Sequence, residues 1–392
     1  MLTEQKNQNL KWQKNQQRHL NYKQRINLGS YYTNIQYVDI VWDMIEPHIN
    51  FKTVILDSSC GYGIFFKEYR PYQQIGVDID SQAIKVAKQK ADLNYYVSNA
   101  LYQVNRKKYE IKTNNPLCII GNPPYNDRTS IIRKSIKNKK VACDADIFTR
   151  DLGMSFLLSY QKLSADIVCV LHPLSYLIKK ANFNLLTKFM RQYQLIDSKV
   201  ISSGVFSQTS TSMEFPILIA LYKKSKQGTT YKNILNFNFK VVGAANFKLI
   251  NFDNISHYVQ KYPNKQQPKK NDILFWTLRD INALKRNQTF IKKYSSNAII
   301  INKSKLEYYI YIDVFKHFSK HIPYYFGNCD VLIDNQLFKK YKKYFILDAL
   351  NRHKQLRQYF IEFDFSKTKA IKYAQSKIAE YLKKLLGAHY VY

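Results

Sequence analysis

Short apolar runs rich in β-branched residues recur along the first part of the chain, separated by stretches with helical periodicity. Such runs, bounded by turn residues, are typical of β-strands. Between them, apolar residues spaced three or four apart predict amphipathic helices at Ser81–Ala91 and Asp151–Leu163, and Ile35 to Ile45 shows the same spacing. Strands alternating with helices indicate an α/β fold with a doubly wound, mostly parallel sheet. The predicted strands cover residues 53–57, 74–80, 95–101, 117–121, 166–171 and 215–222.

Small and acidic residues follow the first two predicted strands. Asp57 opens a turn that contains Gly61 and Gly63, and a helix is expected from Ile64. A glycine-rich turn of this kind lets a ligand approach the backbone and the N-terminus of the next helix. Asp78, in the second strand's acidic end, is placed to accept hydrogen bonds from ribose hydroxyls. Taken singly, these residues are also typical of ordinary turns and helix caps.

The tetrapeptide Asn122-Pro123-Pro124-Tyr125 ends the apolar run 117–121 and suits the alkylation of an exocyclic nitrogen on a planar base. Such a nitrogen is a poor nucleophile because its lone pair is delocalised into the ring. A side-chain amide oxygen and a backbone carbonyl are both acceptors and can hold its two hydrogens. Proline fixes the backbone that aims the carbonyl, and the tyrosine offers a flat face for stacking.

In this order and spacing, residues 28 to 224 resemble the S-adenosylmethionine-dependent amino-methyltransferases, and within them the DNA adenine-N6 methyltransferases of restriction–modification systems. The segment Leu28–Thr33 is similar to the family's methionine-binding motif. The catalytic motif matches at Asn122–Tyr125 without departure. Asn34 and Ser58 stand where the family usually has proline, and Asn99 stands where an acid often contacts the adenine of the cofactor.

The resemblance implies a role for each matching residue. S-adenosyl-L-methionine is the implied cofactor, and Tyr125 and Phe206 are the aromatic residues expected to stack on the target base. Asn122, Pro123, Pro124 and Tyr125 form the implied catalytic set. The implied cofactor-binding residues are Tyr32, Thr33, Asp57, Gly61, Gly63, Asp78, Asn99 and Asn122.

The sequence also indicates which base is the target of methylation. Methylation at carbon 5 of cytosine uses a thiolate in a Pro-Cys dipeptide, and none of the five cysteines follows a proline. Cytosine-N4 enzymes more often carry serine or aspartate in place of Asn122, so adenine is favoured. The expected reaction is a direct in-line displacement that needs no metal and no covalent intermediate. Because the amine lies inside a duplex, the base must first be flipped out.

The charge of the chain favours a nucleic-acid partner. Its formal net charge is +33 over 392 residues, although the abundance of Lys, Asn, Ile and Tyr also fits an A·T-rich genome. Local clustering is more informative than the total. The loop after the catalytic motif is expected to contact DNA phosphates, with a solvated, flexible loop as the alternative interpretation. Its basic residues are Arg128, Arg133, Lys134, Lys137, Lys139 and Lys140.

The chain divides into three predicted parts. Residues 1–27 form a polar, basic arm, residues 28–228 a Rossmann-like methyltransferase domain, and residues 229–392 a mixed α+β region. The last part contains short aromatic and β-branched stretches at 237–242, 298–301 and 308–312, and a mostly helical tail at 344–386. By resemblance it is the target-recognition domain.

Several signals are absent from the sequence. No apolar run approaches the roughly 20 residues that span a membrane, and the N-terminus is polar, so a cytoplasmic enzyme is expected. The cysteines show no metal-site spacing. Double-stranded DNA is the expected partner, together with a possible cognate restriction endonuclease. RNA or protein-glutamine methylation, and a non-catalytic DNA-binding specificity subunit, are the alternative functions.

Overall fold

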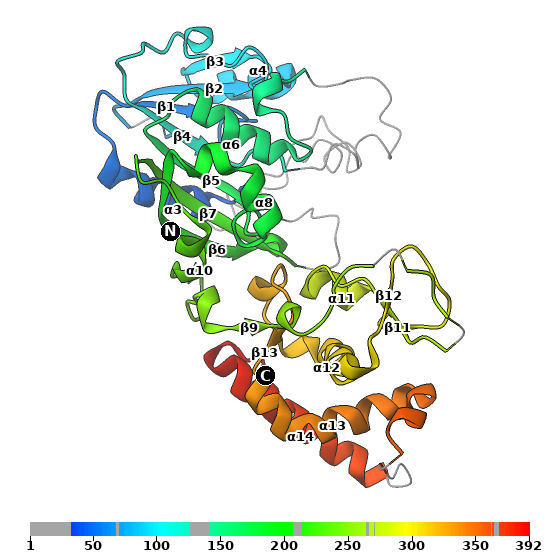
Figure 1. The fold of residues 1–392 in the computed structure, drawn as a ribbon. Helices are drawn as coiled ribbons and strands as arrows, with labels where there is room; N and C mark the ends of the chain where they lie inside the picture. Colours follow the sequence, from blue (N-terminus) through cyan, green and yellow to red (C-terminus); the bar gives the residue numbers. More distant parts are fainter. Residues whose placement is uncertain are drawn as a thin grey trace. The chain divides into compact units, whose positions relative to one another are not determined.

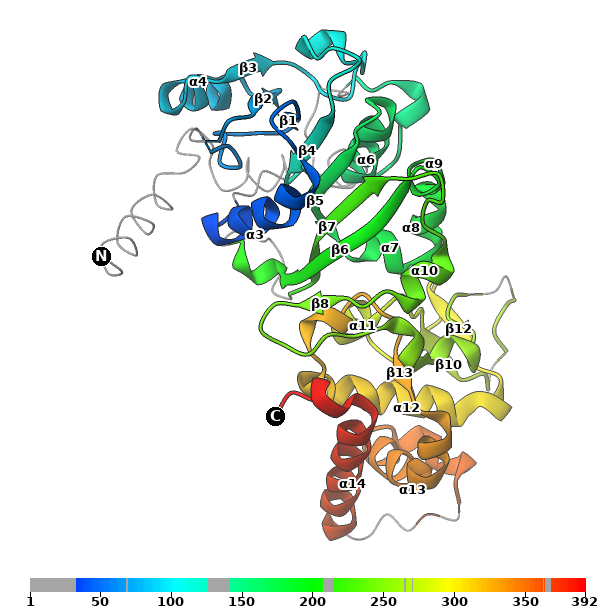
Figure 2. The ribbon, with the colours of Figure 1, turned by 90° about the vertical axis from the view of Figure 1, so that its left-hand side faces the viewer.

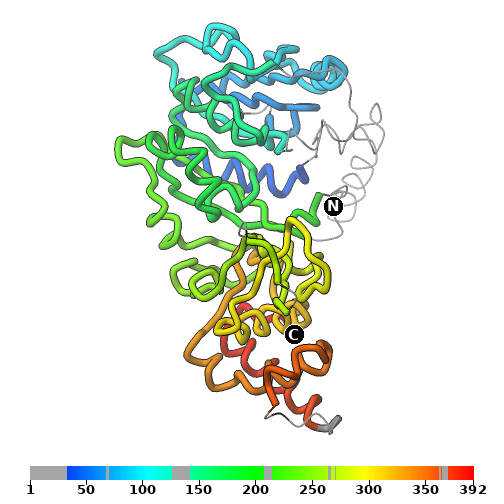
Figure 3. Tube along the Cα trace, turned by 45° about the vertical axis from the view of Figure 1, so that its right-hand side comes forward, coloured from blue at the N-terminus to red at the C-terminus, as the bar shows by residue number. Residues whose placement is uncertain are grey.

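The computed structural model describes residues 33–67, 70–125, 142–206, 214–263, 266–269, 271–361, 363 and 368–392. The chain separates into two compact units, the first extending to Ile234 and the second beginning at Leu235. Figure 3 traces the first from blue to green and the second from green-yellow to red. The division falls a few residues beyond the predicted boundary at residues 228/229.

A large, mostly parallel sheet forms the centre of the first unit (Figure 1). Within the first unit its strands follow the order β3-β2-β1-β4-β5-β7-β6. Neighbours from β3 to β5 run parallel, and β7 runs antiparallel to both β5 and β6. The predicted doubly wound α/β fold is therefore confirmed. The bounds are β1 Val54–Asp57, β2 Gln73–Asp78, β3 Asn94–Val97, β4 Leu117–Gly121, β5 Ile167–Pro173, β6 Tyr193–Ser202 and β7 Pro216–Lys224.

Helices cover both faces of this sheet. Figures 1 and 2 show α3 on one side, and α6 and α8 on the other. The predicted helices near Ile35, Ser81 and Asp151 are present, and the side chains of Asp80 and Asp151 cap two of them by accepting backbone N–H bonds. The bounds are α3 Ile35–Ile45, α4 Ser81–Lys90, α6 Leu152–Lys162, α7 Ser175–Ile178, α8 Lys180–Leu185, α9 Thr187–Met190 and α10 Tyr231–Asn236.

Alternation along the strands gives each face of the sheet its own core. The face under α3 presents Ile55, Cys118, Cys169 and Ile219, all buried in one apolar cluster with the helix residue Trp42. Strand residues of the opposite parity point to the other face, where the aromatic side chains of α6, α7 and α9 pack. This explains why the β4 and β5 runs are apolar without alternation, since both of their faces are covered.

The helix predicted from Ile64 does not form, which is a correction to the sequence analysis. Residues 61–65 are a turn. The backbone groups that a helix would use are bonded elsewhere. The carbonyl of Phe65 accepts from the indole N–H of Trp42 at 2.7 Å. The side chain of Gln74 pairs with both the N–H and the carbonyl of Lys67, at 3.1 and 2.9 Å. Contacts distant in sequence thus override the local pattern.

The second unit is mixed α and β. Strands β9 to β13 are short and pair antiparallel, in the orders β11-β10-β12 and β13-β9. The stretch 308–312 lies inside α12, and the predicted helical tail is resolved into α13 and α14. The bounds are β8 Lys240–Val241, β9 Asp253–Asn254, β10 Leu274–Trp276, β11 Phe290–Ile291, β12 Ala298–Ile300, β13 Leu332–Ile333, α11 Ile281–Arg286, α12 Leu306–His317, α13 Asn335–Arg352 and α14 Thr368–Leu386.

A buried ionic network joins α12 to α13. Asp313 is fully buried and accepts from Arg352 at 2.8 Å, from His353 at 3.0 Å and from Thr289. Arg352 also donates to Asp348, which is fully buried as well. Burial alone would raise the pKa of Asp313, but the hydrogen bond from His353 and the charge of Arg352 hold this pKa well below its ordinary value. The network therefore favours the ionised carboxylate.

Removing this carboxylate is expected to destabilise the second unit. Asp313→Asn leaves Arg352 with one buried acid instead of two and should lower the free energy of unfolding in urea by about 3 kcal/mol at neutral pH. Because the folded pKa is depressed, this contribution is present above the unfolded pKa and is lost as the pH falls through the folded value. Glu380→Gln, which removes the ion pairs of Glu380 with Lys377 and Lys384 at the surface, is the control and should cost much less. Equal losses in the two variants would contradict the account.

Candidate active site

The carboxyl ends of β1 and β4 bring the predicted motifs together. β1 pairs in parallel with β2 on one side and with β4 on the other, so the chain reverses its direction of strand addition between β1 and β4. Ligands of doubly wound sheets bind at this kind of switch point, outside the carboxyl ends of the strands. Asp57 ends β1 and Asn122 directly follows β4. The two residues therefore flank the position where the topology predicts a ligand.

The carboxyl group of Asp57 is buried without a counter-charge. Its side chain belongs to a residue only 1% exposed. Oδ1 accepts from the N–H of Ser59 at 3.0 Å, whereas Oδ2 has no hydrogen-bond partner in the described part of the chain. Burial raises the pKa of Asp57 to about 8; the Ser59 hydrogen bond opposes this rise and the nearby charge of Asp78 adds to it. Near neutral pH the folded protein holds this carboxyl largely protonated.

Gly121 allows the carboxyl group to lie directly against the β4 backbone. A Cβ atom at this position would lie 2.5 Å from Oδ1 of Asp57, and the backbone φ of +135° is one that other residues rarely adopt. The acid of β1 is thus packed against the residue that precedes Asn122. Sequence reasoning did not single out Gly121, although a glycine ending an apolar strand can mark such a close approach.

Asp78 holds the glycine-rich turn in place. Its Oδ2 accepts from the N–H of Gly61 at 2.8 Å, and its Oδ1 accepts from Asp80 at 2.9 Å. Burial raises its pKa, and these backbone hydrogen bonds oppose the rise. Gly61 and Gly63 both have positive φ, and a Cβ at Gly63 would lie 2.6 Å from the hydroxyl of Tyr95. The structure therefore brings together four predicted residues: Asp57, Gly61, Gly63 and Asp78.

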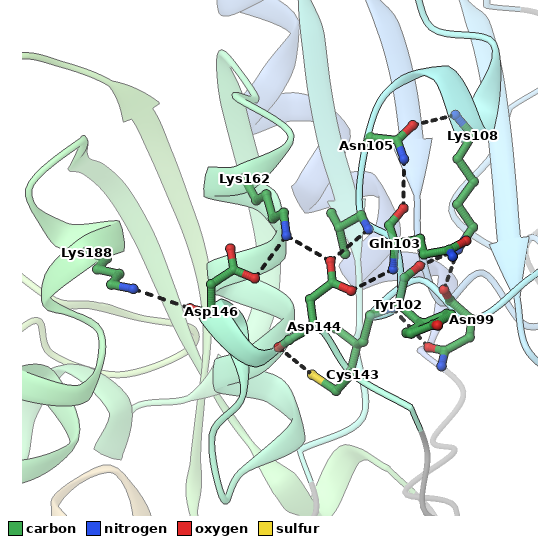
Figure 4. A network of polar contacts seen from close by, with 12 residues as sticks. Asn99, Tyr102, Gln103, Asn105, Lys108, Cys143, Asp144, Asp146, Lys162 and Lys188 are labelled. Carbon is green, nitrogen blue, oxygen red and sulfur yellow. Dashed lines mark hydrogen bonds and ion pairs between the residues drawn. The ribbon is translucent and has the colours of Figure 1, made fainter.

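Asn99, the predicted adenine contact, follows β3 and uses its amide within the protein (Figure 4). Its Nδ2 donates to the carbonyl of Ala142 at 2.7 Å, and its Oδ1 accepts from Leu101 at 3.0 Å. Lys108 donates to the carbonyl of Asn99 in the same network, in which Asp144 binds the backbone of the same loop. These bonds fix the loop after β3. A contact between Asn99 and a nucleotide stays a prediction.

Asn122 connects the predicted catalytic motif to the predicted first motif. Its Nδ2 donates to the hydroxyl of Thr33 at 3.2 Å, and Thr33 is 2% exposed. Because Nδ2 is oriented by this bond, the carbonyl end of the amide has a defined direction, and its Oδ1 is buried. Pro123 is buried, whereas Asn122, Pro124 and Tyr125 are partly exposed. The segment Asn122–Tyr125 is therefore partly exposed to solvent and partly buried.

Tyr125 lies against the N-terminus of α6. A Cβ at Gly153 would lie 3.0 Å from Cβ of Tyr125 and 2.5 Å from the hydroxyl of Tyr176. Tyr176 donates to Asp151, the N-cap of α6, which also accepts from Gly153 at 2.9 Å. Phe206 is 3% exposed and belongs to the core cluster on which Tyr125 packs. Stacking of Tyr125 or Phe206 on a base stays a prediction.

His172 supports this region as a neutral side chain. Burial lowers its pKa to about 4. Its Nδ1 lies 3.0 Å from the carbonyl of Pro173, which can only accept, so Nε2 accepts from the hydroxyl of Tyr222 at 2.8 Å. The imidazole stacks on Tyr176 with ring centroids 5.3 Å apart. The sequence pattern gives no signal for the contacts of His172, Asp151, Gly153 and Tyr176, because these contacts join residues that are distant in sequence.

Some predicted residues lie outside the described residues. These are the cofactor residue Tyr32, the arm 1–27 and the basic loop residues Arg128, Arg133, Lys134, Lys137, Lys139 and Lys140. Within the described ranges, no cluster of His, Cys, Asp or Glu is arranged to hold a metal ion. In the same part of the chain, every helix is too short or too polar to cross a bilayer.

Comparison with known proteins gives similarities of fold only. No protein-family model matches the sequence, and no curated protein matches it. A putative class I S-adenosylmethionine-dependent methyltransferase from Listeria monocytogenes is 14% identical, with 54% of this chain and 64% of that one covered and a TM-score of 0.34. The 23S rRNA methyltransferase ErmE is 10% identical, with 51% and 71% covered and a TM-score of 0.32.

A third similar structure contains a product of methyl transfer. The N-methyltransferase NodS from Bradyrhizobium japonicum, in complex with S-adenosyl-L-homocysteine, is 10% identical, with 50% and 90% covered and a TM-score of 0.31. Similarity at this level does not assign the chain to a family.

Because the Asp57 carboxyl is buried, we expect it to lower the free energy of unfolding of the protein without ligand. Because the folded pKa of this acid is raised above 3.8, its contribution to stability is greatest below that value and is lost as the pH rises towards 8. Asp57→Asn should therefore raise the free energy of unfolding at pH 7 by roughly 2–4 kcal/mol, and by almost nothing at about pH 4. Urea denaturation at both pH values measures this, with the exposed-site variant Asp39→Asn as control. A gain that does not depend on pH would contradict the raised pKa.

Proposed function

We propose that the first unit is an S-adenosylmethionine-dependent methyltransferase that modifies N6 of adenine in double-stranded DNA, as the modification part of a restriction–modification system. The observation that carries this proposal is the position of Asn122. Its amide is oriented by Thr33 and adjoins the Asp57–Gly121 contact at the switch point of the sheet. An oriented amide is what alkylation of an exocyclic amine requires, because the acceptor must face the two hydrogens of the nitrogen.

The residues around the switch point fit the proposed cofactor. Gly61 and Gly63 are partly exposed in the turn after β1, and Asp78 can accept hydrogen bonds beyond those from the backbone, which suits ribose hydroxyls. Asp57 offers a buried carboxyl oxygen without a partner in the described part of the chain, which suits a positively charged group. When bound, S-adenosylmethionine would supply a methyl group attached to a sulfonium.

The catalytic contribution of the protein is positioning. In the proposed complex, the amide oxygen of Asn122 and the carbonyl of Pro123 accept the two hydrogens of the adenine amine. These bonds draw its nitrogen towards a tetrahedral geometry and direct its lone pair at the methyl group. Tyr125, fixed against α6, provides a face on which the base stacks. Flipping the base out of the duplex costs a few kcal/mol, which stacking partly offsets.

The choice of DNA rests on the sequence resemblance and on the basic second part of the chain. A net charge of +33 favours a polyanion, and a region of this length after the core is where the resembled subgroup carries target recognition. RNA is the main alternative substrate, because its adenine amine poses the same chemical problem. Protein glutamine is a weaker alternative, since the enzymes acting on it usually lack such a region. The intact Asn122 and Tyr125 speak against a non-catalytic subunit.

Parallel methylation assays test this function. The purified chain is incubated with cofactor labelled in the methyl group and, separately, with duplex DNA, RNA and release-factor protein. We expect label in DNA and at least a hundredfold loss with Asn122→Ala, while cofactor binding changes only a few-fold. Asn114→Ala, an exposed residue before the opposite end of β4, should retain activity. Label in RNA or protein alone, or full activity of Asn122→Ala, would overturn the proposal.

The contact between Gly153 and Tyr125 gives a second test. Gly153→Ala introduces a methyl group 3.0 Å from Cβ of Tyr125 and 2.5 Å from the hydroxyl of Tyr176, so both side chains must shift. A displaced stacking face should lower DNA methylation about ten- to a hundredfold. The dissociation constant for the cofactor should stay within a few-fold, because the turn at Gly61–Gly63 is untouched. Wild-type activity in this variant would remove Tyr125 from the reaction.

A further inference from the structure

Two buried polar atoms lie close together in sequence at the end of β1 without hydrogen-bond partners in the described part of the chain. They are Oδ2 of Asp57 and Oγ of Ser59. Buried polar groups are nearly always paired, so each exception needs an explanation. The Asp57 carboxyl is also held firmly, by the N–H of Ser59 and by its packing against Gly121. The protein therefore holds the Asp57 carboxyl firmly in place while two buried polar atoms beside it have no partner in the described part of the chain.

The groups that surround Asp57 are acidic or neutral. Asp78 approaches from β2, and the thiol of Cys60 lies in the same turn. From α6, the hydroxyl of Tyr160 bonds Ser58 at 3.2 Å. No Lys, Arg or His of the described residues forms an ion pair with Asp57. A carboxylate in this position has no positive charge to balance it until a ligand brings one.

We propose that Asp57 is the cation-recognition residue of the site: it carries a proton when the site is empty and releases it when a positively charged group of the cofactor binds beside Oδ2. The inference rests on the proposed function and deepens it. In this exchange the O–H bond of the neutral acid breaks, its electron pair stays on Oδ2, and the proton passes to the solvent. The bound state is then an ion pair of carboxylate and ligand cation.

The energetics favour this exchange over a permanently ionised carboxylate. A buried unpaired charge is costly, so the empty site keeps the neutral acid, in agreement with the raised pKa of Asp57. A cation that enters the same low-dielectric corner stabilises the ionised form, and the buried pair is more favourable than either charge alone. The site therefore selects cationic ligands, and its affinity for them depends on pH.

Titration calorimetry with S-adenosylmethionine tests the exchange. Binding heats are compared in two buffers that differ in ionisation enthalpy, because the difference counts the protons released. The wild-type chain should release about one proton per cofactor at about pH 6, where the ammonium group of the cofactor stays protonated. Between about pH 5.5 and pH 7 its affinity should rise by up to about tenfold per pH unit.

Asp57→Asn is the decisive variant, since the amide keeps the shape but cannot ionise. It should bind the cofactor without proton release, with an affinity that no longer changes over this pH range, and at about pH 7 it should bind several-fold more weakly than the wild-type chain. The exposed-site variant Asp39→Asn should release protons like the wild-type chain. The intrinsic fluorescence of the chain, with Trp42 in the core, verifies that each variant is folded.

S-adenosyl-L-homocysteine identifies the cation that Asp57 recognises. This compound has the ammonium group but lacks the sulfonium charge. Proton release with both compounds assigns the ammonium group, and release with S-adenosylmethionine alone assigns the sulfonium; either result supports the exchange. Cofactor binding without proton release, or unchanged release in Asp57→Asn, would overturn the inference and leave the proposed function standing. Failure of the wild-type chain to bind the cofactor would overturn the proposed function itself.

Discussion

The structure of the site depends on the parallel pairing of β1 with β4 and on the close approach that it permits between Asp57 and Gly121. The pairing sets the carboxyl ends of two strands side by side at the point where the sheet changes direction. Because position 121 has no side chain, an acidic group can lie against the backbone that leads into Asn122. The glycine turn and the oriented amide are arranged around this contact.

The buried acids Asp313 and Asp57 differ in their hydrogen-bond partners, and this difference distinguishes a structural role from a candidate functional role. Asp313 accepts from Arg352, His353 and Thr289, and its pKa is depressed, so it is satisfied as a carboxylate. Asp57 receives one backbone hydrogen bond, and its pKa is raised to about 8. The first acid stabilises its unit. The second costs stability in the empty protein, which is typical of groups that a ligand completes.

The sequence predicted the strands at 53–57 and 117–121 and the helices at 81–91 and 151–163 because their signals are local. Apolar runs, capping acids and turn glycines act within a few residues. It also placed Asp57, Asp78 and Asn122 at the ends of three predicted strands, and in the structure these parallel strands share their carboxyl edge.

The errors and omissions arise from contacts between distant residues. The helix expected from Ile64 fails because Trp42 and Gln74 bind its backbone groups. The sequence pattern does not predict that Tyr125 lies beside Asp151, Gly153 and Tyr176. These contacts depend on how α6 and α7 pack over the sheet. The protonation state of the Asp57 carboxyl likewise depends on its burial, which a sequence motif does not reveal.

In the proposed function, the amide of Asn122 directs a methyl group to the amine of adenine in DNA. Mass spectrometry of nucleosides tests it most directly: duplex DNA is incubated with the chain and with S-adenosylmethionine that carries a deuterated methyl group, and is then digested. We expect N6-methyladenine nucleoside that carries the deuterated methyl group. Deuterated methyl found only on cytosine or on a ring nitrogen, or none in the DNA at all, would contradict it.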